Sequence, residues 1–248
     1  MAIPALVLLS WRMRINELSA IKKCRCLYAP EHLGLVDILI VNDKIVRIGE
    51  HIEQPVGLSC QVLDAHGRKV VPGYVDQHVH IIGGGGESGP YSRTPEIFLS
   101  ELTRVGITTV VGVLGTDGTS RHNESLLAKA RGLTHDGISA YMLTGSYEIP
   151  VHNMTGDVRR DIILINECLG VGEIALSDHR SSQPTRAELE KILTQSRLGG
   201  MLSGKAGVVQ FHMGVGERGI DVLFDIVRET EIPAKHFIPT HVNRAFHL

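Results

Sequence analysis

Short apolar segments alternate with helical segments through most of this chain, from residue 73 onward. The apolar segments predict strands at roughly 74–80, 107–115, 138–147, 172–178, 207–214 and 237–243. Between two of them, TPEIFLSELTRVG predicts a helix with Thr94 as N-cap, Pro95 at the first helical position and Gly106 as its end. TRAELEKIL opens with the capping-box spacing of Thr185 and Glu188, and RGIDVLFDIVRET is amphipathic at helical spacing. Repeated strand–helix units favour a parallel sheet, either a (β/α)8 barrel or a doubly wound sheet.

The position of the polar residues favours the barrel. They fall at the C-terminal ends of several different strands, where barrel active sites are built. We therefore predict an α/β fold, an incomplete (β/α)8 TIM-type barrel with about six of the eight strands, over residues 71–248. Residues 36–49, VDILIVNDKIVRIG, predict a β-hairpin that turns at Asn42 and Asp43. This hairpin belongs to a small N-terminal β-sandwich region, 21–70, preceded by an extension of uncertain structure, 1–20.

Composition narrows the class of protein. The chain has 248 residues, of which 43% are hydrophobic, so it can bury a sizeable core. Its net charge is −2 with both signs interspersed, and no apolar run reaches the ~18 residues of a membrane span, so neither nucleic acid nor a membrane is an expected partner. The cysteines form neither a CxxC motif nor a dense framework, which is typical of reduced thiols in a cytoplasmic protein.

Four histidines and one glutamate are the candidate metal ligands. His78 and His80 end the first predicted strand and share a face, because side chains alternate along a strand. Glu173 lies in the fourth strand, and His212 and His241 end the fifth and sixth. At one barrel mouth this set suits two divalent ions bridged by Glu173. A single histidine at a strand end is more often a hydrogen-bonded core residue, so the prediction depends on the whole set.

The opening PGYVDQHVH resembles the PGxxDxHxH segment of the amidohydrolase superfamily. Within that superfamily, seven segments resemble the isoaspartyl dipeptidase family: DQHVHIIGGGGESGP, RTPE, GVLGTDGTSRHNESLLAKARGL, MLTGSYEIP, SDHRS, FHMG and PTHVNR. The resemblance runs from about residue 27 to the end. HxH is shared with hydantoinases and dihydroorotases, whereas GGGGE and SDHRS are more specific. The resemblance implies metal-dependent hydrolysis of the isopeptide bond of L-isoaspartyl dipeptides by a metal-bridging hydroxide, with release of aspartate and with zinc as the expected metal.

The resemblance also implies how a small dipeptide substrate is bound. Glu87 would bind its free α-amino group, and Tyr147 would donate to the scissile carbonyl as it becomes an oxyanion. Two arginines beside the metal ligands suit substrate carboxylates, because arginine grips carboxylates bidentately. The implied substrate-contact residues are Gly85, Glu87, Thr116, Tyr147, Arg180 and Arg244.

Two positions depart from the family. The bridging ligand is usually a carboxylated lysine, and here the aligned residue is Glu173, a bridge that other amidohydrolases use. The proton-shuttling aspartate of the family ends the eighth strand, with a substrate-binding serine close after it, whereas this sequence stops at Leu248, just past the sixth. Asp117 and Asp178 do not occupy that place, so the general acid–base aspartate is expected to be absent.

Two alternatives to an isoaspartyl dipeptidase stay open at this point. The chain could be an inactive truncated fragment that at most binds metal. It could also be another amidohydrolase, of the hydantoinase, dihydroorotase or N-acyl amino acid deacylase type. A full-length protein of this kind is expected to form a cytoplasmic homo-oligomer.

Overall fold

A computed structural model describes residues 18–27, 31–42 and 44–244. The chain divides into two compact units. The first contains the chain up to Val75 together with Leu99–Thr109 and His135–Ser139. The second contains Asp76–Phe98, Val110–Thr134 and the chain from Ala140 onward. Most of the predicted extension, residues 1–17, lies outside the described residues.

The first sheet has five strands in the order β3-β2-β1-β4, with β5 also pairing with β1. Its strands are β1 (Leu18–Leu27), β2 (His32–Val41), β3 (Lys44–Gly49), β4 (Cys60–Asp64) and β5 (Lys69–Val70). The strands β2 and β3 pair antiparallel, so the predicted hairpin is confirmed. Asn42 turns the chain with a φ of 55°, a conformation that asparagine tolerates better than most residues, and Asp43 lies outside the described residues.

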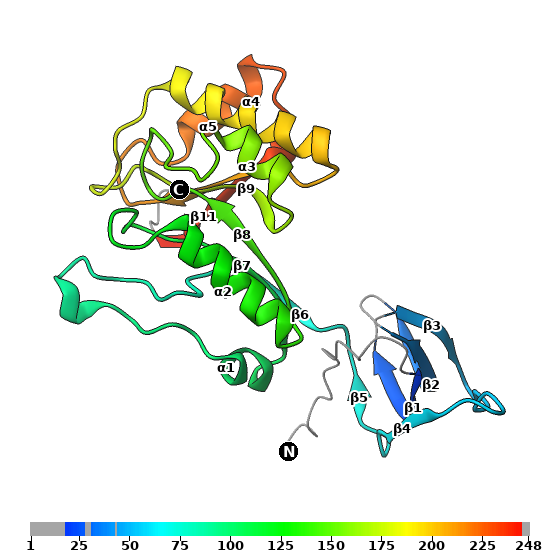
Figure 1. The fold of residues 1–248 in the computed structure, drawn as a ribbon. Coiled ribbons are helices and arrows are strands. Elements are labelled where there is room, and N and C mark those ends of the chain that lie inside the picture. Colours follow the sequence, from blue (N-terminus) through cyan, green and yellow to red (C-terminus); the bar gives the residue numbers. More distant parts are fainter. Residues whose placement is uncertain (1–17, 28–30, 43, 245–248) are drawn as a thin grey trace. The chain divides into compact units, whose positions relative to one another are not determined.

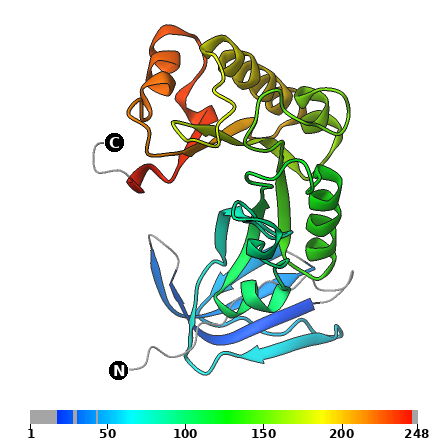
Figure 2. The same ribbon diagram turned by 90° about the vertical axis from the view of Figure 1, so that its left-hand side faces the viewer.

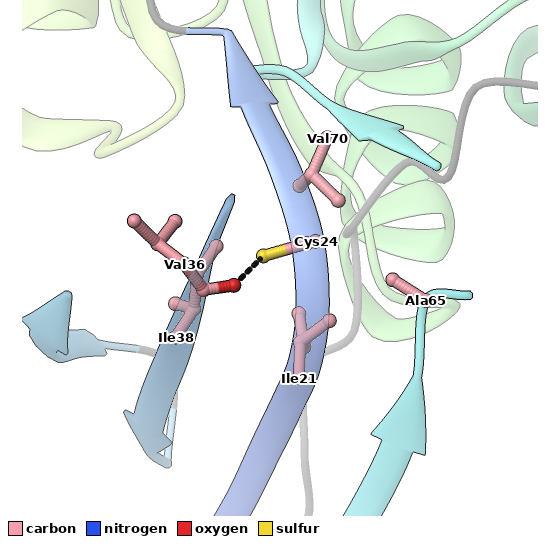
Figure 3. Close-up of a cluster of buried hydrophobic side chains, with 6 residues drawn as sticks. All are labelled: Ile21, Cys24, Val36, Ile38, Ala65 and Val70. Atoms are coloured by element: carbon pink, nitrogen blue, oxygen red, sulfur yellow. Dashed lines mark hydrogen bonds between the residues drawn. The ribbon is translucent and has the colours of Figure 1, made fainter. Parts of the chain in front are cut away.

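One face of this sheet carries a small hydrophobic core (Figure 3). The cluster consists of Ile21, Cys24, Val36, Ile38, Ala65 and Val70. Val36 and Ile38 are two apart in β2, so they point to the same side of the sheet. The Cys24 thiol packs with the apolar side chains and donates a hydrogen bond of 2.8 Å to the Val36 carbonyl oxygen.

The buried carboxylate of Asp37, in β2, connects the segment after β3 to strand β1. It accepts hydrogen bonds from Lys22 Nζ at 2.9 Å and from the backbone N–H groups of Lys23 and Ile52, each at 3.0 Å. Lys22 Nζ also donates to the Ile52 carbonyl oxygen. Burial by itself would raise the pKa of Asp37, but these hydrogen bonds and the Lys22 charge outweigh burial and lower the pKa. An unpaired charge here would be costly.

The second sheet has six strands, and their spatial order equals their order in the chain (Figures 1 and 2). The strands are β6 (Tyr74–Val79), β7 (Ile107–Gly112), β8 (Ser139–Thr144), β9 (Cys168–Leu176), β10 (Val208–Met213) and β11 (Phe237–Thr240). The pairs β8–β9, β9–β10 and β10–β11 are parallel. A doubly wound sheet reverses its strand order at a switch point, so a monotonic order confirms the incomplete barrel.

Helices separate these strands. They are α1 (Leu99–Arg104), α2 (Asn123–His135), α3 (Val158–Leu164), α4 (Arg186–Ser203) and α5 (Asp221–Glu229). The helices α3 and α4 pack against β9. The predicted capping box at Thr185 and Glu188 is confirmed at the start of α4. Among the described helices, none is both long enough and apolar enough to cross a lipid bilayer.

The predicted helix start at Thr94 is wrong, because α1 begins five residues later at Leu99. The Thr94 hydroxyl instead accepts a 2.7 Å hydrogen bond from the Gly84 N–H, and the Thr94 N–H donates to the Gly84 carbonyl at 2.9 Å. Thr94 thus hydrogen-bonds to the glycine run, residues 83–86, instead of capping a helix. Gly106 does follow the helix with a φ of 88°, which suits glycine.

Candidate metal centre

Three imidazoles from three different strands or strand ends surround the side chain of Glu173. The Glu173 carboxylate lies in β9 and is 0% exposed. His212 of β10 places Nδ1 at 2.6 Å from Oε1, and His241, which follows β11, places Nε2 at 3.4 Å from the same oxygen. His78 of β6 places Nε2 at 3.2 Å from Oε2. Donor atoms of His78, Glu173 and His241 all lie within 4.8 Å of one another, so this group could hold a metal ion.

His80 lies beside this group, with its ring centroid 5.5 Å from that of His78. Two glycines make room for its ring. A Cβ at Gly115 would stand 2.6 Å from His80 Cε1, and a Cβ at Gly84 would stand 3.0 Å from His80 Cγ. Gly115 also has a φ of 77°, so both space and backbone conformation require glycine there.

The electrostatics of the group favour the protonation states that bind metals. Burial opposes ionisation of Glu173, but hydrogen bonds and charge from His212 and His78 outweigh it and lower the pKa to about 2. Burial lowers the pKa of His80 and of His241 below the ordinary value of 6.5. An ionised carboxylate and neutral imidazoles are the ligand forms.

Two buried ring nitrogens of the group, Nδ1 of His78 and Nδ1 of His80, have no hydrogen-bond partner within the described part of the chain. An unsatisfied buried polar group costs about 1–3 kcal/mol. Coordination to a cation would relieve that cost, and a mixed nitrogen and oxygen donor set fits zinc or a similar divalent ion.

Tyr147, in the segment after β8, reaches the same group. Its hydroxyl oxygen lies 2.6 Å from His212 Nδ1. Burial and the nearby Glu173 charge raise the pKa of Tyr147 above its usual range, so the phenol stays protonated and able to donate. The Arg180 guanidinium lies over the Tyr147 ring, 5.2 Å from its centroid, which adds a cation–π contact.

Arg180 connects two carboxylates at this edge of the sheet. Its Nε and Nη2 donate to Oδ1 and Oδ2 of Asp178, each at 2.8 Å, and its Nη1 donates to Glu87 Oε1 at 2.9 Å. The bonds from Arg180 hold the pKa of Asp178 far below its usual range. The sequence did not predict this pairing of Arg180 with Asp178 and Glu87, although the SDHRS segment places a carboxylate two residues before an arginine. The predicted binders of the substrate amine and carboxylate, Glu87 and Arg180, are thus paired with each other.

The other predicted substrate-contact residues lie in the loops around this group. Arg244 is exposed and places Nη1 at 3.3 Å from His212 Nε2. The carbonyl of Gly85 accepts a 3.1 Å hydrogen bond from Nη1 of the buried Arg121, which also donates to Gly84 at 2.9 Å. Thr116 is half-buried in the segment after β7. Arg121, which was not among the predicted site residues, therefore holds the glycine run in place.

A parallel sheet whose strand ends bring histidines around a buried glutamate matches an incomplete barrel of the amidohydrolase type. Two solved structures of beta-aspartyl dipeptidase from Fervidobacterium islandicum AW-1 are each 48% identical to this chain, with TM-scores of 0.89. They cover 94% and 93% of this chain, and one of them holds the dipeptide beta-Asp-Leu. The resemblance expected from the sequence is confirmed: this chain is similar to beta-aspartyl dipeptidases over nearly all of its length. It spans 60% and 62% of those two chains.

More distant proteins share the fold or short stretches of sequence. L-hydantoinase from Arthrobacter aurescens is 21% identical with a TM-score of 0.54, over 86% of this chain and 44% of its own. A dihydroorotase from Pelotomaculum thermopropionicum is 47% identical over 45 residues, or 18% of this chain and 10% of its own. An adenine deaminase from Paracoccus denitrificans is 32% identical over 100 residues, or 37% of this chain and 16% of its own. No protein-family model matches the chain.

Proposed function

We propose that this chain carries the metal centre and substrate-binding residues of a metal-dependent isoaspartyl dipeptidase. The observation that carries the proposal is the convergence of His78, His212 and His241 on buried Glu173, with contacts of 2.6 to 3.4 Å. The 48% identity to beta-aspartyl dipeptidase supports the choice of substrate over cyclic amides.

The proposed metal ligands are His78, His80, Glu173, His212 and His241, and zinc fits their donor atoms. Two divalent ions are proposed, and Glu173 would help to hold both, because its two oxygens face different imidazoles. Divalent ions bound there would activate water at neutral pH and polarise the scissile carbonyl.

The charged residues of the site favour a dipeptide that carries both an amine and carboxylates. Arg180 and Arg244 would bind the carboxylates, Glu87 would bind the α-amino group, and Gly85 and Thr116 would complete the contacts. Since Glu87 and Arg180 pair with each other at 2.9 Å, the substrate ammonium and carboxylate would replace that pair. A hydrogen bond to a charged group contributes about 1.5–3 kcal/mol, enough to favour an acidic dipeptide over a neutral one.

Tyr147 would stabilise the oxyanion, since its protonated phenol can donate a hydrogen bond to developing negative charge. Asp178 would hold Arg180 in place through its two 2.8 Å bonds. In the described residues around the site, Glu87 and Asp178 both bind Arg180, so we assign neither as the group that transfers the proton.

The test is to purify the 248-residue chain, measure its metal content and assay it with beta-Asp-Leu, a hydantoin and an N-acyl amino acid. We expect a stoichiometric divalent metal and cleavage of beta-Asp-Leu alone. A preference for the hydantoin would favour another amidohydrolase. Stoichiometric metal without any hydrolysis would identify a metal-binding chain that is not itself an enzyme. His152→Asn, at an exposed histidine distant in sequence from every proposed ligand, is the control for metal content.

A further inference from the structure

The segment that carries Tyr147 is held on both sides by one buried amide. Asn123 is the first residue of α2 and is only 5% exposed. Its Oδ1 accepts a 3.1 Å hydrogen bond from the Gly145 N–H, and its Nδ2 donates a 2.9 Å hydrogen bond to the His152 carbonyl oxygen. Tyr147 lies between Gly145 and His152, so Asn123 closes the loop that presents the phenol.

A second buried side chain, Asp161 of α3, holds the same segment a few residues further on. It is 0% exposed. Its carboxylate accepts hydrogen bonds from the Thr144 hydroxyl at 2.6 Å, the Met154 N–H at 3.0 Å and the Thr155 N–H at 2.8 Å. Asp161 therefore joins the end of β8 to the end of the loop.

The loop between these contacts has little room to shift. A Cβ at Gly145 would stand 2.7 Å from Val151 Cγ1, so the backbone there already packs against the loop's far side. The Tyr147 carbonyl accepts a 3.0 Å hydrogen bond from the Ala175 N–H. A shift of residues 145–152 would thus change the position of the phenol relative to His212, which it approaches to 2.6 Å.

We propose that Asn123 is a positioning residue, which acts through Tyr147 by fixing residues 145–152. This inference rests on the proposed function, in which Tyr147 donates to the oxyanion. Among the described residues, the Asn123 side chain bonds Gly145 and His152, which are neither candidate metal ligands nor predicted substrate-contact residues. A misplacement of about 1 Å at a catalytic group can cost up to about a hundredfold in rate. Loss of the two Asn123 hydrogen bonds should therefore lower kcat and leave KM nearly unchanged.

The first test is a double-mutant cycle assayed with beta-Asp-Leu. Asn123→Asp preserves the acceptor for the Gly145 N–H and places a carboxylate oxygen against the His152 carbonyl. We expect it to lower kcat about tenfold or more in the wild-type background, and less than about twofold in Tyr147→Phe. Equal losses in both backgrounds would mean that Asn123 acts independently of Tyr147, which overturns the proposal. Full activity of Tyr147→Phe would instead refute the role of Tyr147 in the proposed function.

The second test does not depend on turnover. Hydrogen–deuterium exchange of the whole chain should speed up in residues 145–155 of Asn123→Asp and stay unchanged in α4 and β10. Asn153→Asp is the matched control, because the hydrogen bonds given for the Asn153 side chain in the described part of the chain are local: it donates to the Val151 carbonyl at 3.2 Å and accepts from the Gly156 N–H at 2.9 Å. If residues 145–155 of Asn123→Asp exchanged at the wild-type rate, the Asn123 hydrogen bonds would not fix the loop. This result would overturn the proposal even in an inactive chain.

Discussion

At the scale of single residues, the proposed metal centre depends most on the buried Glu173 carboxylate. Glu173→Gln keeps the shape of the side chain and removes its charge. We expect metal affinity to fall at least about tenfold, because the neutral amide is a weaker ligand than a carboxylate. Zinc titration of the apo chain measures this. Glu167→Gln, which changes an exposed pair with Arg131, is the control and should bind like the wild type.

The shifted pKa values of the histidines predict how metal binding depends on pH. Burial lowers the pKa of His80 and His241 below 6.5, so both imidazoles stay neutral down to lower pH than a free histidine. We expect the affinity for zinc to be nearly constant from pH 8 to about 6.5 and to decline only at lower pH. Equilibrium dialysis across this range measures it. A decline that begins well above pH 6.5 would contradict this assignment of ligands.

Tyr147→Phe removes one hydrogen-bond donor and little volume. If the phenol stabilises the oxyanion, kcat for beta-Asp-Leu should fall by about 10²–10³ and KM should change little. Steady-state kinetics separates the two constants. Tyr141→Phe, on the neighbouring strand β8, is a matched control and should retain its activity.

The convergence of the histidines could be predicted from the sequence, whereas the ion pair between Arg180 and Glu87 could not. His78, His212 and His241 could be predicted to converge because each lies at or near the end of a parallel strand, and such ends share one edge of the sheet. The pairing of Arg180 with Glu87 could not, because it joins loops 93 residues apart whose paths no local pattern dictates. Asn123 and Asp161 were missed because each reads in the sequence as an ordinary polar residue of a helix.

At the scale of helices and strands, two threonines with similar sequence signals have different roles. Thr185 caps α4, since its hydroxyl accepts from the Glu188 N–H and the Glu188 carboxylate accepts from the Thr185 N–H at 2.8 Å. Thr94 has the same kind of signal, followed by proline, yet it bonds Gly84. A local propensity predicted the first and failed at the second because a long-range hydrogen bond to the glycine run competes with the cap.

Alanine substitutions at these two threonines should therefore have different effects. Thr185→Ala should lower the free energy of unfolding by about 1 kcal/mol, the typical cost of a lost cap, as measured by urea denaturation. Thr94→Ala should speed hydrogen exchange in the glycine run, residues 83–86, and leave α1 unchanged. Faster exchange in Leu99–Arg104 with a protected glycine run would mean that Thr94 acts as a helix cap after all.

At the scale of the whole molecule, the alternation of strands and helices was enough to predict the parallel sheet, and the polar strand ends were enough to choose the barrel. The boundaries were less predictable: β9 begins at Cys168, four residues before the predicted strand, because Cys168 and Gly170 are buried against β8 and β10. Periodicity does not report such pairing, since a strand buried on both faces does not alternate.

The free energy of unfolding of the first unit should depend on Asp37. Its pKa is lowered in the folded state, so its contribution is complete above the unfolded value of about 3.8 and is lost as pH falls through the folded value. Asp37→Asn should therefore destabilise the first sheet by about 1–3 kcal/mol at pH 7, since it leaves Lys22 without its carboxylate partner. The difference from wild type should shrink below pH 3.8.

Urea denaturation, together with hydrogen exchange of β1 and β2, measures the loss of stability. The control is Asp64→Asn, which changes an exposed pair with Lys23 and should be nearly neutral. A difference that persists unchanged at low pH would show that Asp37 acts through its shape and not through its charge.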